Sequence, residues 1–424
     1  MIFTFFSLIA CQNLQRPLIC IHGFGGIQTD AELTGFVPTC NTDKKTIHIY
    51  ELDKDIAQQY PDCISYFLET QIDSENHVFQ NPNFTLKVPP FLSTEKRNPF
   101  TSLTGYFLDR KYTLNKDLIA FTYNWFLYPV GTPELFSQLQ SLIEKAYQDS
   151  GKKVVLLGHS FGTHVIRQFI LQGMTESWVK KHVEGAIFSA PAFFGCAGPF
   201  DFFVKGQFSS LPITNYSTRV TRKMPSIHAM FLNYVAFKDQ VVFSDLSKYG
   251  NVTAPQVHDF FVKNGFLSEE ANRMFNLVEG SLKQEPKELP IRSLVLYNSG
   301  MDAIVSYKGD NFEPIYGPGD QICQSSGPEY ACKHWNNVEC VDWKRVGDEW
   351  NHDNMLHRIQ EIDKIYEFIT KYDEEDDNKK TLLYILIAVS AFTVVLIIAL
   401  VIVAVVLMKK NPNTSLNNSL ISSA

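Results

Sequence analysis

Positive charge is scarce along this sequence of 424 residues, and it is nowhere concentrated. There are 38 Lys and Arg residues against 45 Asp and Glu residues, which gives a formal net charge of −7. Lys and Arg form no cluster apart from the pairs that flank the last apolar run, so the chain lacks the basic surface with which proteins bind nucleic acid. We therefore expect no nucleic-acid partner.

Motifs for metal ions and cofactors are also missing. No CxxC pair and no cluster of Cys and His has the spacing of a zinc site, and no internal repeat is visible. We expect no metal ion and no cofactor. The chain is 45% hydrophobic and long enough to bury one large core, so we assign residues 12–373 to a single folded domain with appendages.

Two apolar segments indicate a membrane protein. Residues 381–408 form an uncharged apolar run, longer than the roughly 20 residues that cross a bilayer, and predict a transmembrane helix. A linker at 374–380 precedes it, and a tail at 409–424 that begins with two Lys residues favours a cytoplasmic C-terminus. Residues 1–11 are apolar but lack a basic start. We interpret them as a signal peptide, with a trimmed start as the alternative.

The cysteines and possible glycosylation sites agree with an oxidising, luminal or extracellular compartment. The chain has eight cysteines, and Asn-X-Ser/Thr sequons that could carry glycans lie at Asn83, Asn215 and Asn251. Some disulfide pairing is expected among the later cysteines, which are Cys196, Cys323, Cys332 and Cys340.

The sequence alternates between patterns typical of strands and of helices. Apolar runs predict buried strands at residues 16–21, 118–123, 153–158, 183–189 and 291–297. Apolar residues at helical spacing predict helices over 134–149, 162–171 and about 355–372. This order predicts an α/β domain with a parallel sheet covered on both faces. Residues 192–285 lose the alternation, and we expect them to form an inserted cap or lid.

A nucleophile motif lies between one predicted strand and the following helix. Gly158-His159-Ser160-Phe161-Gly162 matches G-x-S-x-G, which in this setting is typical of the sharp turn of an α/β-hydrolase. Ser160 is therefore the expected nucleophile. Two backbone N–H groups must face the oxyanion that such a serine generates. We expect them from Phe161 and from the glycine-rich turn after the first strand, most directly from Phe24.

A serine nucleophile needs a histidine base and a carboxylate, which this fold places later in the chain, acid first. His352 is the favoured base because it lies in a polar turn just before the last helix, with His357 and His334 as competitors. Asp302 follows a buried strand, and Asp320 lies in a later Gly/Pro turn. Topology alone does not separate these two acids.

Several segments in a fixed order resemble one family of lipid enzymes. In chain order they are the spacing of Cys40 and Cys63, Tyr123-Asn124-Trp125, the G-x-S-x-G motif, residues 178–191, Met224-Pro225-Ser226, Gly319-Asp320 and His352-Asp353-Asn354-Met355-Leu356. Together, over residues 16–370, they resemble the lecithin:cholesterol acyltransferase family, which includes the lysosomal phospholipase A and the phospholipid:diacylglycerol acyltransferases.

The resemblance carries over to particular residues. It implies that Asp320 is the acid, and that a disulfide between Cys40 and Cys63 closes a membrane-contact loop at 40–63. The family's acid lies in a G-D-G-T-V or G-D-D-T-V turn, whereas this chain has Gly-Asp-Gln-Ile-Cys at 319–323, so Asp302 stays open as the alternative. Phe126 stands where the family often has Arg, and the turn at 22–26 is more similar to that of a general lipase.

The resemblance also implies a reaction. It predicts an α/β-hydrolase fold that moves a fatty acyl group from a phospholipid, through an acyl-Ser160 intermediate, to a lipid alcohol or to water. The expected partners are a phospholipid membrane and an alcohol acceptor, with association at a membrane or lipoprotein surface. The sequence leaves two alternatives, a neutral-lipid or carboxyl-ester lipase and a surface receptor that keeps the fold without turnover. It does not predict an oligomeric state.

Overall fold

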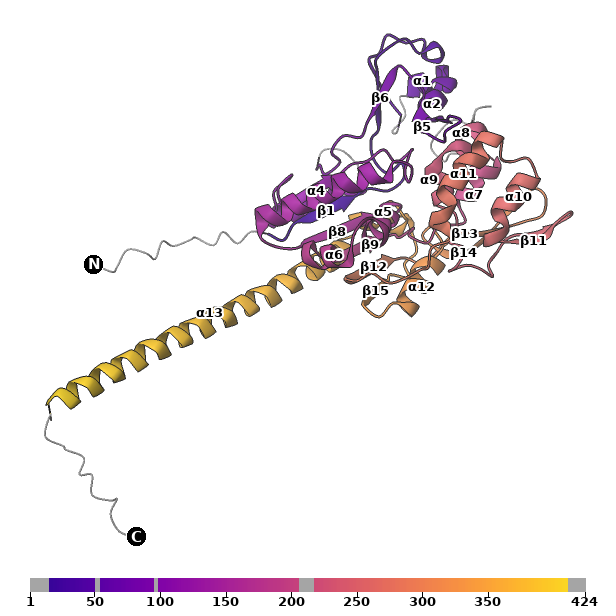
Figure 1. Ribbon diagram of the computed structural model, residues 1–424. Coiled ribbons are helices and arrows are strands. Elements are labelled where there is room, and N and C mark those ends of the chain that lie inside the picture. Colours follow the sequence, from indigo (N-terminus) through magenta and orange to yellow (C-terminus); the bar gives the residue numbers. More distant parts are fainter. Residues whose placement is uncertain (1–14, 50–53, 95–97, 206–216, 411–424) are drawn as a thin grey trace. The chain divides into compact units, whose positions relative to one another are not determined.

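The computed structural model of the protein describes residues 15–49, 54–94, 98–205 and 217–410, and contacts divide the chain into two units, Met1–Tyr366 and Glu367–Ala424 (Figure 1). The predicted signal peptide, the sequon at Asn215 and all but the start of the predicted tail lie outside the described residues. Those three predictions remain as they stand.

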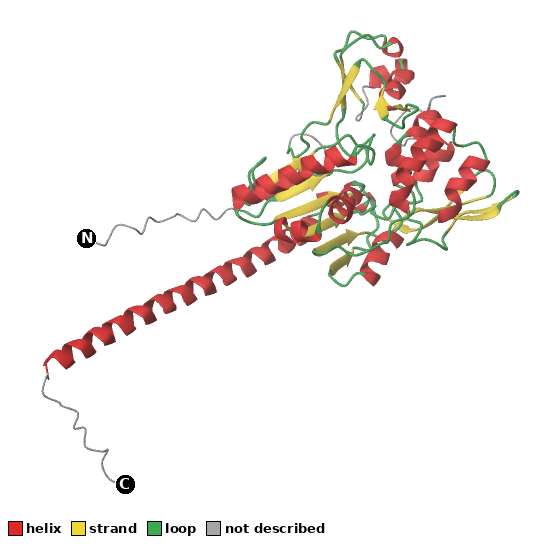
Figure 2. Cartoon of the chain, in the orientation of Figure 1, coloured by secondary structure: helices red, strands yellow, loops and turns green. Residues whose placement is uncertain are grey.

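A six-stranded parallel sheet forms the centre of the first unit, as the sequence predicts (Figure 2). Its order is β15 (Val338–Asp342), β12 (Arg292–Tyr297), β9 (Val183–Ser189), β8 (Val154–His159), β1 (Leu18–Ile21) and β7 (Leu118–Phe121), and each neighbouring pair is parallel. Every residue of β1 and β8 is buried, so both faces of the sheet are covered there.

Helices cover this sheet where the spacing of apolar residues predicts them. α4 (Thr132–Ser150) and α5 (Gly162–Gln168) pack against β8, and α6 (Glu176–His182) packs against β9. The predicted helix over 162–171 ends differently, because a π-helical turn, η2 (Phe169–Gly173), replaces its last residues. α3 (Thr101–Asp109) and α12 (Ser326–His334) complete the layer around the sheet ends.

The segment between β1 and α3 forms a small lobe, of which only the membrane-contact loop at 40–63 was expected. It contains η1 (Pro38–Cys40), α1 (Lys54–Gln59), α2 (Pro61–Leu68) and two small antiparallel sheets. One is β3 (Thr46–His48), β2 (Asp30–Leu33) and β6 (Phe84–Lys87), and the other is β4 (Thr70–Ile72) with β5 (Val78–Gln80). The disulfide between Cys40 and Cys63 joins η1 to α2.

Residues 192–285, which we expect to form an inserted cap or lid, lie between the core strands β9 and β12. This segment contains α7 (Pro199–Lys205), α8 (Ser217–Lys223), α9 (Pro225–Ala229), β10 (Val241–Leu246), β11 (Gly250–Thr253), η3 (Ala254–Gln256), α10 (Val257–Lys263) and α11 (Glu269–Leu282). β10 and β11 share a sheet with β13 (Met301–Lys308) and β14 (Glu313–Gly319), which follow β12 in the chain. The pairing is non-local, so the boundary at 285 divides a structure that is continuous in space.

Disulfides fasten the later part of this unit. Cys196 pairs with Cys323, and Cys332 pairs with Cys340, which agrees with the expected pairing among these four cysteines. Cys20 is a buried free thiol on β1. The first of the two bridges closes a separation of 127 residues and ties the start of the insertion to the turn after β14.

The C-terminal part contains one helix where the sequence analysis predicts two helices and a linker. After η4 (Asp348–Trp350) and η5 (Met355–His357), α13 runs from Ile359 to Lys410 without interruption, and residues 374–380 belong to it. These residues contain neither Gly nor Pro, so nothing in them ends a helix. Within it, Ile385–Leu407 has a mean hydropathy of 3.2 and no buried residue, which suffices by length and composition to cross a membrane.

Candidate active site

Ser160 occupies a strained turn between β8 and α5. Its φ is +56°, a left-handed conformation that costs an L-residue about 1–2 kcal/mol. The turn is possible because glycines surround it. A Cβ atom on Gly162 would lie 2.3 Å from the carbonyl oxygen of Ile21, and one on Gly158 would lie 2.8 Å from the Gly162 carbonyl carbon. The two glycines of the motif are thus required by close backbone approach.

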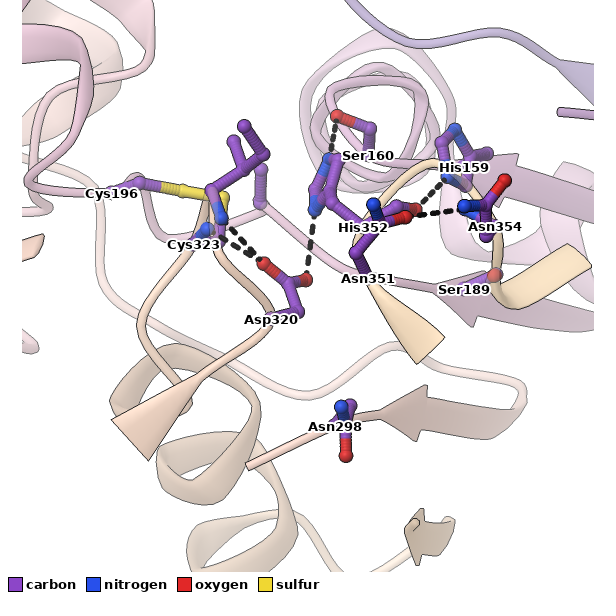
Figure 3. A network of polar contacts seen from close by, with 12 residues as sticks. His159, Ser160, Ser189, Cys196, Asn298, Asp320, Cys323, Asn351, His352 and Asn354 are labelled. Carbon is purple, nitrogen blue, oxygen red and sulfur yellow. Dashed lines mark hydrogen bonds and ion pairs between the residues drawn. A yellow bond between two sulfur atoms is a disulfide. The ribbon is translucent and has the colours of Figure 1, made fainter. Parts of the chain in front are cut away.

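Ser160, His352 and Asp320 lie in one hydrogen-bonded row (Figure 3). His352 Nε2 is 2.6 Å from Ser160 Oγ, and His352 Nδ1 is 2.8 Å from Asp320 Oδ2. The carboxylate accepts a hydrogen bond from the N–H at Nδ1, which leaves Nε2 as the acceptor for the serine hydroxyl. The arrangement can therefore remove a proton from Ser160.

The turn after β14 fixes the orientation of Asp320. Its Oδ1 accepts hydrogen bonds from the backbone N–H groups of Ile322 at 3.1 Å and Cys323 at 2.7 Å. Because Oδ1 is occupied in this way, Oδ2 is left to face the imidazole. The disulfide from Cys323 to Cys196 anchors the same turn to the inserted segment (Figure 3).

His352 is held by its backbone as well as by its ring. Its N–H donates to the carbonyl oxygen of Asp320 at 2.9 Å, and its own carbonyl lies 2.8 Å from Nε2 of His159. Burial, together with repulsion from His352, lowers the pKa of His159 to about 4, so this ring is neutral and can donate the bond. His159 is a supporting residue that the sequence analysis missed, although it lies inside the G-x-S-x-G motif.

Burial and charge act in opposite directions on the imidazole of His352. Burial alone would lower its pKa, but the attraction of Asp320, the hydrogen bond to that carboxylate and the charge of Asp353 outweigh it, and the net pKa is raised above 6.5. A raised pKa makes the ring a stronger base.

The competing residues lie elsewhere. Asp302 is exposed on β13 and makes no hydrogen bond or ion pair with His352 in the described part of the chain. His357 Nδ1 is 2.8 Å from Ser102 Oγ on α3, and His334 packs on the ring of Tyr330 at the end of α12. The geometry thus places Asp320, and not Asp302, in contact with His352, a choice that the order of strands alone leaves open.

The two expected oxyanion donors flank the serine. Phe161 follows it directly, and no hydrogen bond among the described residues engages the Phe161 backbone N–H. The turn after β1 lies against the same serine, since a Cβ atom on Gly23 would be 2.7 Å from Ser160 Cβ. The ring of Phe24 packs on Trp125, with centroids 4.5 Å apart, which holds the turn in place.

A cavity of about 230 Å³ opens over Ser160. The turn at 23–26, Ser160 and His352 line it together with Pro199, Phe202 and Met230 of the inserted segment, and Asp201 and Asp353 are its charged lining residues. The lining is largely apolar, which suits a hydrocarbon chain more than a charged group.

Comparison with known proteins connects this site to one family. The sequence model of the lecithin:cholesterol acyltransferase family matches residues 73–285, which is half of the chain. The chain belongs to this family. The predicted resemblance is thereby confirmed.

The relatives are distant, but the similarity is broad. The phosphatidylcholine-sterol acyltransferase of Gallus gallus is 26% identical over 61% of this chain and 65% of its own length. That of Homo sapiens is 23% identical over 84% of this chain and 83% of its own length. The lysosomal phospholipase A and acyltransferase of Bos taurus is 25% identical over 76% of this chain and 84% of its own length.

Solved structures are less similar. A soluble variant of monoglyceride lipase from Saccharomyces cerevisiae is 10% identical and covers 85% of this chain and 87% of its own, with a TM-score of only 0.32. We draw nothing from that likeness. Membership of the lecithin:cholesterol acyltransferase family, together with the parallel sheet and the turn at Ser160, makes the chain an α/β-hydrolase of the acyltransferase and phospholipase type.

Other predicted features can be located but not assigned a role. Asn83 and Asn251 are exposed, and their side chains hydrogen-bond to Phe36 and Asp245 respectively, so both stay candidate glycosylation sites. In the ranges that the structure describes, no group of three or more His, Cys, Asp or Glu side chains could hold a metal ion.

Proposed function

We propose that this member of the lecithin:cholesterol acyltransferase family is a serine-dependent O-acyltransferase and phospholipase that acts on phospholipids at a membrane surface. The observation that carries the proposal is the row of Ser160, His352 and Asp320 at the base of an apolar cavity. Serine, base and acid in hydrogen-bond contact are the arrangement that acyl transfer through a covalent intermediate requires.

In the first half-reaction, Ser160 Oγ attacks the carbonyl carbon of a phospholipid ester while His352 Nε2 takes the hydroxyl proton. The negative charge that develops on the carbonyl oxygen faces the N–H of Phe161 and an N–H of the turn that contains Phe24. The tetrahedral intermediate then breaks its bond to the glycerol oxygen. That oxygen takes the proton from His352, so a lysophospholipid leaves and acyl-Ser160 remains.

In the second half-reaction, an alcohol or a water molecule attacks the acyl-enzyme. His352 removes its proton and returns that proton to Ser160 Oγ as the acyl ester or the fatty acid forms. Asp320 stays ionised throughout and keeps the imidazole in one tautomer and one orientation. Acyl transfer and hydrolysis thus differ only in which nucleophile reaches acyl-Ser160.

The membrane setting is supported by two features outside the site. Ile385–Leu407 has the length and composition of a membrane span, which supports a single-pass anchor with residues 12–373 as a luminal or extracellular catalytic domain. The disulfides agree with that compartment. Near the loop closed by Cys40 and Cys63, Phe36 is 76% exposed, which supports contact between this lobe and a lipid surface.

Product analysis tests the proposal. The full chain and its Ser160→Ala variant would be incubated with mixed vesicles of phospholipid, with and without a sterol or diacylglycerol, and all products identified by mass spectrometry. Lysophospholipid and acylated alcohol formed by the wild type alone would support it. Cleavage of triacylglycerol but not phospholipid would indicate a neutral-lipid lipase. A folded chain whose Ser160 fails to react with a fluorophosphonate would indicate a receptor without turnover.

A further inference from the structure

A buried carboxyl group lies behind the catalytic row and takes no part in the chemistry proposed above. Glu361 is the third residue of α13 and is fully buried. Its Oε1 shares a short hydrogen bond with Ser189 Oγ, and its Oε2 accepts one from Trp343 Nε1 at 3.1 Å. A fully buried glutamate is unusual unless a cation pairs with it. Among the described residues, no Lys or Arg forms an ion pair with Glu361.

The partner on one side of Glu361 supports the nucleophile. Ser189 is the last residue of β9, the strand beside β8, and it lies opposite His159 in the register of these strands. Its carbonyl oxygen accepts the backbone N–H of Ser160 at 3.0 Å. The side chain and the backbone of Ser189 therefore connect the carboxyl of Glu361 to the strained turn.

The partner on the other side supports the base. The ring of Trp343 packs on Trp350, with centroids 5.1 Å apart, and Trp350 precedes His352 by two residues. The Trp350 carbonyl also accepts a hydrogen bond from Asn298 at the end of β12. Glu361 thus bridges the strand that backs Ser160 and the packed indoles that hold the loop of His352.

The charges around Glu361 favour its neutral form. Asp320, in the turn after β14, acts on Glu361 through its negative charge. Asp342, next to Trp343, binds Ser299 instead, and Arg358, just before α13, forms no ion pair with Glu361 in the described structure. The pKa of Glu361 is raised to about 8, chiefly by burial; the hydrogen bonds from Ser189 and Trp343 act to lower it, and the charge of Asp320 makes a smaller contribution that raises it.

We propose that Glu361 is a positioning residue that works in its protonated form, joining the Ser160 turn to the His352 loop, and that its ionisation disrupts this connection and lowers acyl transfer. The inference rests on the proposed function for its activity readout. Ionisation would place a second negative charge near Asp320 without a cation to balance it. The buried site can relieve this unfavourable charge only if the surrounding segments move apart or water enters.

The test compares Glu361→Gln with the wild type from pH 5 to pH 10, using the full chain in phospholipid–detergent micelles. The amide cannot ionise. With its oxygen accepting from Trp343 Nε1, its NH₂ donates to Ser189 Oγ as the O–H of a neutral carboxyl would, in place of the bond that Ser189 Oγ donates to a carboxylate. Wild-type kcat/KM should fall about tenfold between pH 7 and pH 9, as expected for a required proton with a pKa near 8. The variant should match the wild type at pH 7 and lack this fall.

Two further variants make the test specific. Trp343→Phe keeps a ring against Trp350 but removes the N–H that stabilises the carboxylate, so the alkaline fall should move to higher pH. Glu367→Gln, an exposed change on the same helix, should reproduce the wild-type profile. If kcat/KM falls equally with rising pH in the wild type and in Glu361→Gln, the proposal is overturned. So would a Glu361→Gln variant that is already tenfold impaired at pH 7.

A stability measurement separates this inference from the proposed function. The folded chain retains the Glu361 proton up to about pH 8, whereas an unfolded glutamate loses it near its ordinary value of 4.5. The wild type should therefore lose thermal stability as pH rises between these values, and Glu361→Gln should lose less. If neither protein releases acyl groups but the two differ in this way, the acyl-transfer function fails while the buried neutral carboxyl stands. If their stability profiles coincide, the inference about Glu361 fails.

Discussion

Replacing Asp320 by Asn tests the hydrogen-bonded row most directly. The backbone N–H groups of Ile322 and Cys323 both point at Oδ1, so the amide oxygen of the variant must take that position. The amide NH₂ then replaces Oδ2 and faces Nδ1 of His352. Two donors cannot share that contact, so the imidazole moves its proton to Nε2. In that tautomer Nε2 faces Ser160 Oγ as a donor and cannot accept the hydroxyl proton.

The expected loss follows from the wrong tautomer. The same kind of exchange in a serine protease lowers kcat by about 10⁴-fold, which corresponds to about 5.5 kcal/mol of transition-state stabilisation. We expect Asp320→Asn to lower kcat/KM by roughly 10³- to 10⁴-fold here. The substitution also removes the main influence that raises the pKa of His352, so burial would dominate and that pKa would fall below 6.5. The acid limb of the residual activity should therefore move to lower pH.

The assay combines kcat/KM for a soluble short-chain ester with the rate of fluorophosphonate labelling, each measured from pH 5 to pH 9. Asp302→Asn is the matched control, because Asp302 is an exposed aspartate near the start of β13 and lies outside the row. It should change kcat/KM by less than about twofold. A severe loss in Asp302→Asn with near-normal activity in Asp320→Asn would refute the assignment of the acid.

The remaining predictions concern the turn and its anchor. Ser160→Ala and Ser160→Gly should both abolish acyl release, and Ser160→Gly should be the more stable by about 1 kcal/mol in denaturant titration, because glycine tolerates the positive φ. Equal stability would show that the turn is not strained. Gly162→Ala should prevent soluble expression or lower the thermal midpoint sharply, since its Cβ would overlap the carbonyl oxygen of Ile21. Cys196→Ser with Cys323→Ser should cost about 5 kcal/mol by loop entropy over 127 residues and should also reduce kcat. An unchanged kcat would show that the Asp320 turn holds its shape without the bridge.

Local patterns in the sequence carry the main features of the fold. The strands at 118–121, 154–159 and 183–189 fall where apolar runs predict them, because buried parallel strands need apolar residues on both faces. The nucleophile can be recognised for a similar reason. A strand, a Gly-x-Ser-x-Gly turn and a helix are contiguous in the chain, so their residues already describe the local geometry.

The sequence was a poorer guide to the surroundings of the inserted segment and to the continuity of the last helix. The inserted segment at 192–285 shares a sheet with later residues, because β10 pairs with β13, which lies beyond the core strand β12, and no local pattern indicates this pairing. The expected linker at 374–380 is part of the helix α13, because these polar residues include neither Gly nor Pro to end it.

By itself the sequence determined the order of strands and helices, the position of the serine and a short set of possible partners, since each of these follows from neighbouring residues. Only the tertiary structure decided which acid meets His352, because Asp302 lies exposed near the start of β13, whereas Asp320 lies in the turn directly after the adjoining strand β14, where its carboxylate reaches His352. It also brought Glu361 from the last helix to the back of Ser189, a contact across 172 residues that no local pattern encodes.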